Sequence, residues 1–193
     1  AIKYILAKYK NSESHLIAAL QKNGKAIQFI KKPSDKLKKI ALSQNGHAIH
    51  FIENPTEDLQ LIAVKTHGTS ISDIIDKGIR PSEMVQMEAV KQNYDAIYWL
   101  QEGGIEISEQ VWLTALSHNG YALEYIENPP EHYKEVAVKQ NPKAITYVDN
   151  PSEKLQLSVI EVDPSNIKYI KKPKASVIKR FEELTGRKYE PIR

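Results

Sequence analysis

Two histidines and a glutamate are the residues of this sequence whose spacing comes nearest to a metal site. His47, His50 and Glu53 follow one another at intervals of three residues, which would bring their side chains to one face of a helix. Imidazole and carboxylate groups can ligate zinc in such an arrangement, but solvated surface histidines share the same spacing. We therefore expect no metal here and no other cofactor.

The sequence offers little else for catalysis. Glu102 with Glu106, or Glu124 with Glu127, could act as paired carboxylates, yet acids at helical spacing are usually surface residues. There is no cysteine, no glycine-rich phosphate loop and no recognisable nucleophile motif. We expect a protein that is not an enzyme. We also expect a cytoplasmic location and no membrane contact, because no segment reads as a signal peptide or a membrane span.

Basic residues gather towards both ends of the sequence. Residues 1–40 hold ten lysines and two acids, residues 41–165 hold eight basic and nineteen acidic residues, and residues 166–193 hold nine basic and three acidic residues. Such ends could neutralise phosphates without reading a base sequence, whereas the acidic middle would repel a nucleic acid. Opposite charges along one chain also permit self-association. The candidate nucleic-acid contacts are Lys31, Lys32, Lys168, Lys171 and Lys172.

All of these residues lie within an internal repeat. An anchor residue, most often proline, returns after 22, 22, 26, 26, 22, 22 and 22 residues, at Asn11, Pro33, Pro55, Pro81, Ile107, Pro129, Pro151 and Pro173. A fixed period of this length is typical of stacked helical arrays. We predict an all-α fold, an α-solenoid of roughly seven short helix-turn-helix repeats in a single domain of residues 1–193.

Each anchor is expected to open a first helix. The asparagine before the anchor would be its N-cap, the proline its first residue and a glutamate its third. An alanine eight residues after most anchors would let neighbouring helices approach closely. The helix would end in left-handed conformation at a pair such as Asn45–Gly46. Asn-Gly is also typical of β-hairpins, but helical spacing on both sides favours helices. The three expected N-caps are Asn54, Asn128 and Asn150.

A short and largely apolar second helix is expected in each repeat, as in residues 48–52 and 96–100. We place its recurrent aromatic residues in the core rather than in stacking contact with bases; they are Phe29, Phe51, Trp99, Tyr125, Tyr147 and Tyr169. Positions that vary between repeats are expected on the surface, which helical arrays use for binding. A plain solvated face is the alternative. The candidate partner-binding residues are His47, His50, Tyr98, Tyr121, Glu124 and Lys143.

The repeated pattern Asn-Gly, Ala-Leu/Ile, Tyr/Phe-Ile, Asn-Pro-Ser/Thr-Glu is clearest in residues 45–57, 119–131 and 141–153. It resembles an uncharacterised family of helical repeats found in phages, large DNA viruses and some bacteria, and the resemblance covers nearly the whole chain. It implies a helical-repeat fold and a viral origin, with no established activity. The two 26-residue repeats depart from the pattern, because Asp73 stands where an aromatic residue is expected and residues 101–106 replace Asn-Pro. We expect altered curvature there.

The ends of the chain are expected to depart from the repeat as well. Residues 1–10 match a second helix without its first, residues 174–186 a polar capping helix, and residues 187–193 a basic tail. The sequence therefore predicts a non-catalytic protein–protein interaction module, which as a viral protein could bind and modulate or inhibit a host or defence protein. Nucleic-acid binding through the basic ends is the alternative.

Overall fold

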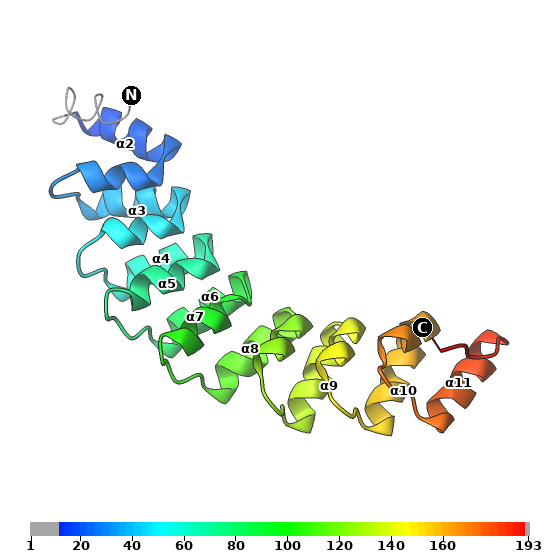
Figure 1. Ribbon diagram of the computed structural model, residues 1–193. Helices are drawn as coiled ribbons and strands as arrows, with labels where there is room; N and C mark the ends of the chain where they lie inside the picture. Colours follow the sequence, from blue (N-terminus) through cyan, green and yellow to red (C-terminus); the bar gives the residue numbers. More distant parts are fainter. Residues whose placement is uncertain (1–11, 192–193) are drawn as a thin grey trace. The chain divides into compact units, whose positions relative to one another are not determined.

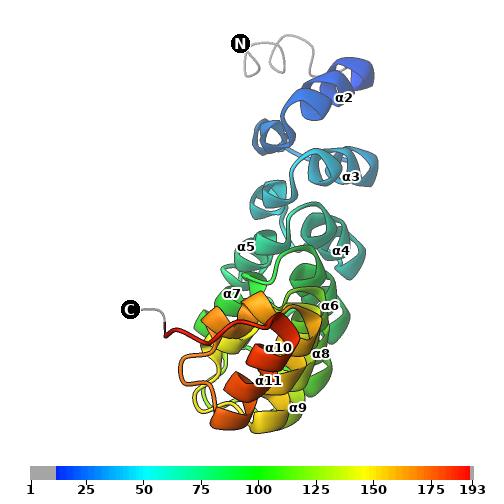
Figure 2. The same ribbon diagram turned by 90° about the vertical axis from the view of Figure 1, so that its right-hand side faces the viewer.

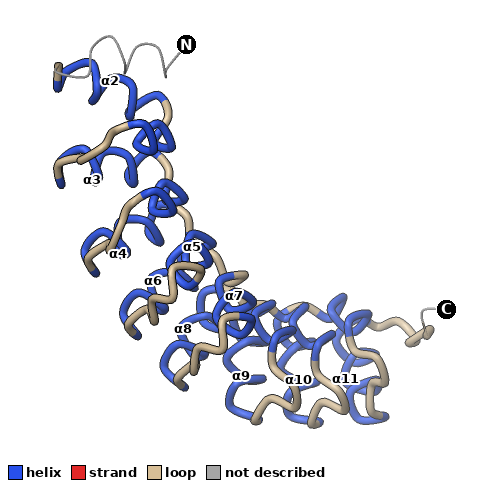
Figure 3. Tube along the Cα trace, turned by 60° about the vertical axis from the view of Figure 1, so that its left-hand side comes forward, coloured by secondary structure: helices blue, strands red, loops and turns tan. Residues whose placement is uncertain are grey.

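The computed structural model describes residues 12–191, and this part of the chain consists of short helices packed in series, without a strand (Figures 1 and 3). The half repeat expected at residues 1–10 lies outside the described residues. Each first helix begins two residues after its anchor, so the period of the sequence is the period of the structure. The first helices are α2 (Glu13–Lys22), α3 (Asp35–Gln44), α4 (Glu57–Thr66), α6 (Glu83–Gln92), α8 (Glu109–His118), α9 (Glu131–Gln140), α10 (Glu153–Val162) and α11 (Ala175–Thr185).

A second, shorter helix follows the first helix in seven of these repeats. In the 22-residue repeats it is a six-residue 3₁₀ helix: η1 (Gly24–Phe29), η2 (Gly46–Phe51), η4 (Gly120–Tyr125), η5 (Pro142–Tyr147) and η6 (Pro164–Tyr169). The 26-residue repeats instead have η3 (Gly68–Ser70) running into α5 (Ile71–Ile75), and α7 (Ala96–Glu102). A 3₁₀ helix rises about 2.0 Å per residue and an α-helix about 1.5 Å, so six residues of one span about the same length as eight of the other. The second helices of the longer repeats therefore span about 10 to 14 Å, against about 12 Å for a six-residue 3₁₀ helix.

The chain divides into two compact units, residues 1–111 and 112–193. In the first unit α2, α3, α4 and α6 pack one after another, and their second helices pack in the same order beside them. Figure 2 shows α4 and α6 on one side and α5 and α7 on the other. In the second unit α9, α10 and α11 pack successively, with η4, η5 and η6 in contact with one another and with these helices.

The core lies between the first and second helices of each repeat. Ala41 and Leu42 of α3 are fully buried, and so are Ala48, Ile49 and Ile52 in and after η2. Helices of six to ten residues are not stable alone in water, so this burial, worth about 1.5–3 kcal/mol for each large aliphatic side chain, holds them. Within the described residues, no helix combines the length and the apolar character needed to cross a membrane.

The start of the first helix differs from the prediction. The N-cap is the residue after the anchor: Ser152 Oγ accepts a hydrogen bond from the Leu155 N–H at 3.2 Å, and Ser34 serves α3 in the same way. The glutamate follows at the first helical position, where its charge suits the positive end of the helix. The expected N-caps instead adopt left-handed backbone, which asparagine tolerates better than most residues. Their φ angles are 45° at Asn54, 50° at Asn128 and 54° at Asn150.

The end of the first helix also differs from the prediction. Asn45 and Asn141 have extended backbone, with φ near −150°, rather than left-handed backbone. Their side-chain oxygens accept hydrogen bonds from the N–H two residues later, at 3.0 Å and 3.1 Å. These asparagines therefore cap the 3₁₀ helix that follows. Left-handed backbone does end α11, where Gly186 has a φ of 67°.

Candidate interaction surface

Glycine at the start of a second helix allows one repeat to pack closely against the next. A Cβ at Gly24 would collide with the carbonyl oxygen of Ala41, and a Cβ at Gly120 with that of Ala137. Both glycines have negative φ, so the requirement is for space rather than for an unusual backbone. Gly46 and Gly68 meet the corresponding carbonyl oxygens, those of Ala63 and Ala89. We call these four contacts the glycine junctions.

Each glycine junction also contains a hydrogen bond between repeats. The Gly24 N–H donates to Oε1 of Gln44 at 2.6 Å, and the Gly120 N–H donates to Oε1 of Gln140 at 2.6 Å. The Gly68 N–H donates to Oε1 of Gln92. A backbone N–H left unpaired in a packed junction would reduce the stability of the fold. In these three junctions the glutamine of the following repeat accepts the hydrogen bond, and so contributes to holding neighbouring repeats in register.

The second helices bury one side and expose the other, and the exposed side carries the recurrent aromatic residues. This corrects the prediction that these rings lie in the core. The exposed fraction is 43% for Phe29, 36% for Phe51, 39% for Trp99 and 40% for Tyr147, while Tyr125 and Tyr169 are half-buried. In most second helices an alanine and an isoleucine or leucine, such as Ala48 and Ile49, fill the space between the helices, and the ring that follows lies at its rim.

The partner-binding residues predicted from the sequence lie on these same second helices. His50, Tyr98, Glu124 and Lys143 are exposed, whereas His47 and Tyr121 are half-buried. Several of them contact aromatic rings. The ring centroids of Tyr98 and Trp99 are 5.0 Å apart, and those of Tyr121 and Tyr147 are 6.0 Å apart. Lys143 Nζ lies 5.6 Å from the ring centroid of Tyr169. Each unit therefore presents aromatic and charged groups side by side on its second helices.

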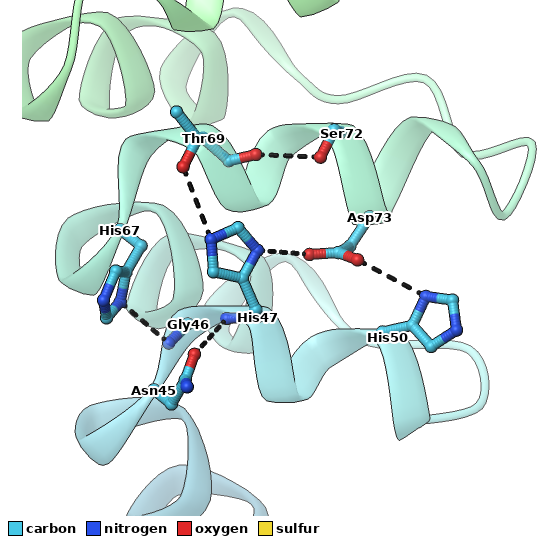
Figure 4. Close-up of polar contacts among 8 residues, drawn as sticks. All are labelled: Asn45, Gly46, His47, His50, His67, Thr69, Ser72 and Asp73. Atoms are coloured by element: carbon cyan, nitrogen blue, oxygen red, sulfur yellow. Dashed lines mark hydrogen bonds and ion pairs between the residues drawn. The ribbon is translucent and has the colours of Figure 1, made fainter. Parts of the chain in front are cut away.

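Asp73 joins two of these residues in a cluster that links successive repeats (Figure 4). Its Oδ2 lies 2.7 Å from Nδ1 of His47, and its Oδ1 lies 3.3 Å from Nδ1 of His50. The carboxylate comes from α5 and both imidazoles from η2. Sequence reasoning noted the departure at Asp73 but did not pair it with the histidines. The available signal was a carboxylate at an aromatic position, one repeat after two histidines.

The imidazole of His47 faces the carboxylate of Asp73 on one side and the hydroxyl of Thr69 on the other. Among the described residues, no group of three histidine, aspartate or glutamate side chains could hold a metal ion. Nε2 of His47 lies 3.4 Å from Oγ1 of Thr69. That separation is at the long end of the range for a hydrogen bond. The Asp73 carboxylate, the His47 imidazole and the Thr69 hydroxyl therefore follow one another in a row. The geometry fits a contact between repeats.

The basic residues proposed for nucleic acid are all exposed. In the second unit Lys171 pairs with Asp149 at 3.2 Å, and Lys168 Nζ lies 5.1 Å from the ring centroid of Tyr169. The Lys171–Asp149 pair borders a groove of about 410 Å³, which is lined by Asp149, Asn150, Pro151, Gln156, Lys171, Lys172 and Lys174. Three lysines and one aspartate give this groove a net positive charge.

Comparison of the chain with protein-family models, with curated proteins and with solved structures gives no match in any of the three. The exposed residues of the second helices and the basic groove are therefore the features that bear on function.

Proposed function

We propose that the chain is an α-solenoid that binds another protein through its second helices, without catalysis. The observation that supports the proposal is the exposure of Phe29, Phe51, Trp99 and Tyr147 at one repeated position. Rings exposed to this degree add less to folding than buried ones, and aromatic residues are enriched at protein interfaces. The neighbouring candidates His47, His50, Tyr98, Tyr121, Glu124 and Lys143 would supply polar contacts around them.

The proposal is tested by affinity purification of the tagged protein from a lysate, with and without nuclease, followed by mass spectrometry. One variant, Tyr98→Ala/Trp99→Ala, removes two exposed rings from α7. The matched control is Met84→Ala, because Met84 is 55% exposed but belongs to the first helix α6. We expect a nuclease-resistant partner that the wild type and the control retain, and that the α7 variant binds at least about tenfold more weakly. Equal capture by all three proteins would contradict the proposal.

On the basis of the viral resemblance, we extend this proposal to a partner that is a host or defence protein. The protein would then modulate or inhibit that partner. The measurement is the partner's own activity at increasing concentrations of this protein. Activity that remains unaltered at saturation would exclude inhibition and leave binding alone.

The second candidate function is nucleic-acid binding through the basic residues, and the net positive groove of the second unit favours it. Binding of this kind would weaken steeply as the salt concentration rises. In the same purification, nucleic acid that disappears with Lys168→Glu/Lys171→Glu/Lys172→Glu, but not with Lys139→Glu outside the groove, would support it. Absence of nucleic acid in the untreated sample would reject it.

A further inference from the structure

One glycine junction is built differently from the other three. At the end of α4 the chain reads Thr66-His67-Gly68, where the ends of α3, α6 and α9 carry Gln-Asn. In consequence the Gly46 N–H donates to Nδ1 of His67, at 3.1 Å, instead of to a glutamine oxygen (Figure 4). An acceptor that titrates near neutral pH thus replaces one that does not titrate.

The hydrogen bond fixes the protonation state of His67. A backbone N–H can only donate, so Nδ1 of His67 must accept and carries no proton. The ring is therefore neutral, with its proton on Nε2. Protonation would place a second N–H at Nδ1, directly opposite the Gly46 N–H, and the hydrogen bond between the two repeats would be lost.

We propose that the Gly46–His67 junction is a pH-sensitive contact between two repeats, closed while His67 is neutral and opened when the ring gains a proton. Because Gly46 begins η2, opening acts on the helix that carries His47 and His50. The inference does not depend on the proposed binding function.

The surroundings of His67 set the direction of the response. Burial lowers the pKa of His67 from its ordinary value of 6.5, and the charges of His47 and Lys25 lower it further. The rings of His47 and His67 are 5.4 Å apart, and Asp73 holds His47 from the other side. Lys77, after α5, donates to the His50 carbonyl oxygen at 2.6 Å. With a lowered folded-state pKa, the stabilisation is complete above about pH 6.5 and is lost as the pH falls through that lowered value.

Amide hydrogen exchange followed by NMR tests this within one molecule. The amides of Gly24 and Gly120 are matched controls, because each donates to a glutamine oxygen at 2.6 Å. We expect the protection factor of the Gly46 amide to fall about fivefold relative to both controls between about pH 7.5 and about pH 5. A Gly46 amide whose protection changes in parallel with those of Gly24 and Gly120 would overturn the proposal.

A variant built from the chain's own repeat gives a second test. Thr66→Gln/His67→Asn places at this junction the Gln-Asn pair of Gln44–Asn45. We expect the Gly46 amide to lose its additional pH dependence in this variant. Persistence of that dependence would show that another group is responsible. If the variant does not fold, the comparison of amides in the wild type still decides the matter.

Discussion

Single residues in this chain are matched across the boundary between repeats. Where a second helix begins with Gly24, Gly68 or Gly120, the next repeat carries an alanine at its eighth position and a glutamine at its eleventh. In η5 and η6 the glycine position is occupied by Pro142 and Pro164. Proline has a side chain, so the next repeat cannot approach as closely as at a glycine, and it has no backbone N–H to donate. The repeats that follow them replace the alanine by Val159 and Phe181 and the glutamine by Val162 and Leu184. At Gly24, Gly68 and Gly120 the glutamine accepts the hydrogen bond of the glycine N–H, a donor that proline lacks.

Replacement of a junction glycine tests the steric part of this match. In Gly120→Ala the new Cβ would collide with the Ala137 carbonyl oxygen, so we expect a loss of about 1–3 kcal/mol in the free energy of unfolding, measured in urea. The control is Pro142→Ala, at a position that already accommodates a Cβ, with an expected cost under about 1 kcal/mol. Equal losses for both variants would show that glycine is not required for close packing.

Ser152 is another residue that serves two repeats at once. Its hydroxyl accepts the Leu155 N–H at the start of α10 and donates to Glu131 Oε1, in the preceding repeat, at 2.7 Å. That second hydrogen bond is the largest cause of the lowered pKa of Glu131, with Lys134 and Lys154 adding to it. The stabilisation is therefore present above about pH 4.5 and is lost as the pH falls through the lowered pKa.

We expect Ser152→Ala to raise the pKa of Glu131 towards its ordinary value of 4.5, as measured by NMR titration of the carboxyl carbon. Loss of the cap should also cost about 1 kcal/mol at neutral pH. Ser34→Ala removes the equivalent cap of α3 and should leave the Glu131 titration unchanged. An unaltered Glu131 pKa in Ser152→Ala would refute the link between repeats.

The second helix of each repeat has a buried face and an exposed face. In η2 the buried face is Ala48 and Ile49, and the exposed face carries His50 and Phe51. The apolar composition of residues 48–52 predicts burial but does not separate these faces. A 3₁₀ helix turns every three residues, so only the tertiary contacts decide which apolar side chain remains at the rim. For this reason the helix was predicted correctly and the position of its aromatic residue was not.

Substitutions on the two faces should have unequal effects on stability. Ile49→Ala leaves a cavity in the core and should reduce the free energy of unfolding by about 2–5 kcal/mol. Phe51→Ala should cost less than about 2 kcal/mol, because more than a third of the residue is already in water. Chemical denaturation of both variants measures the difference. A Phe51→Ala cost equal to that of Ile49→Ala would restore the core assignment of the aromatic residues.

At the scale of the whole molecule, stability comes from contacts between neighbouring repeats. The helices α2, α3, α4 and α6 pack one on the next, as do α9, α10 and α11, and arrays of this kind need about three repeats to fold. The division into residues 1–111 and 112–193 follows shortly after Ile107, the anchor at which the period returns from 26 to 22 residues. It falls within α8, in the region where the repeat pattern is least regular.

Fragments that contain the last helices of the chain test this dependence on neighbours. Residues 107–193, which contain α8 to α11, should retain a cooperative helical transition in circular dichroism. Residues 150–193 contain only α10, η6 and α11 and should be largely unfolded, because fewer than about three repeats cannot bury a continuous core. A folded short fragment, or an unfolded long one, would contradict the nearest-neighbour account.

The sequence by itself determined the helical class, the period, and the start of every first helix to within two residues, because proline, asparagine and apolar spacing act locally. It also indicated the second helices and the small alanine in most repeats. Only the tertiary structure decided that Asn45 caps the following helix, that Gly46 is held by His67, and that Asp73 faces two histidines. The Asn45 cap is a local contact with the His47 N–H, and it requires extended backbone at Asn45. The Gly46–His67 and Asp73 contacts join residues about one repeat apart in the chain, so they depend on how neighbouring repeats pack, which local sequence pattern does not specify.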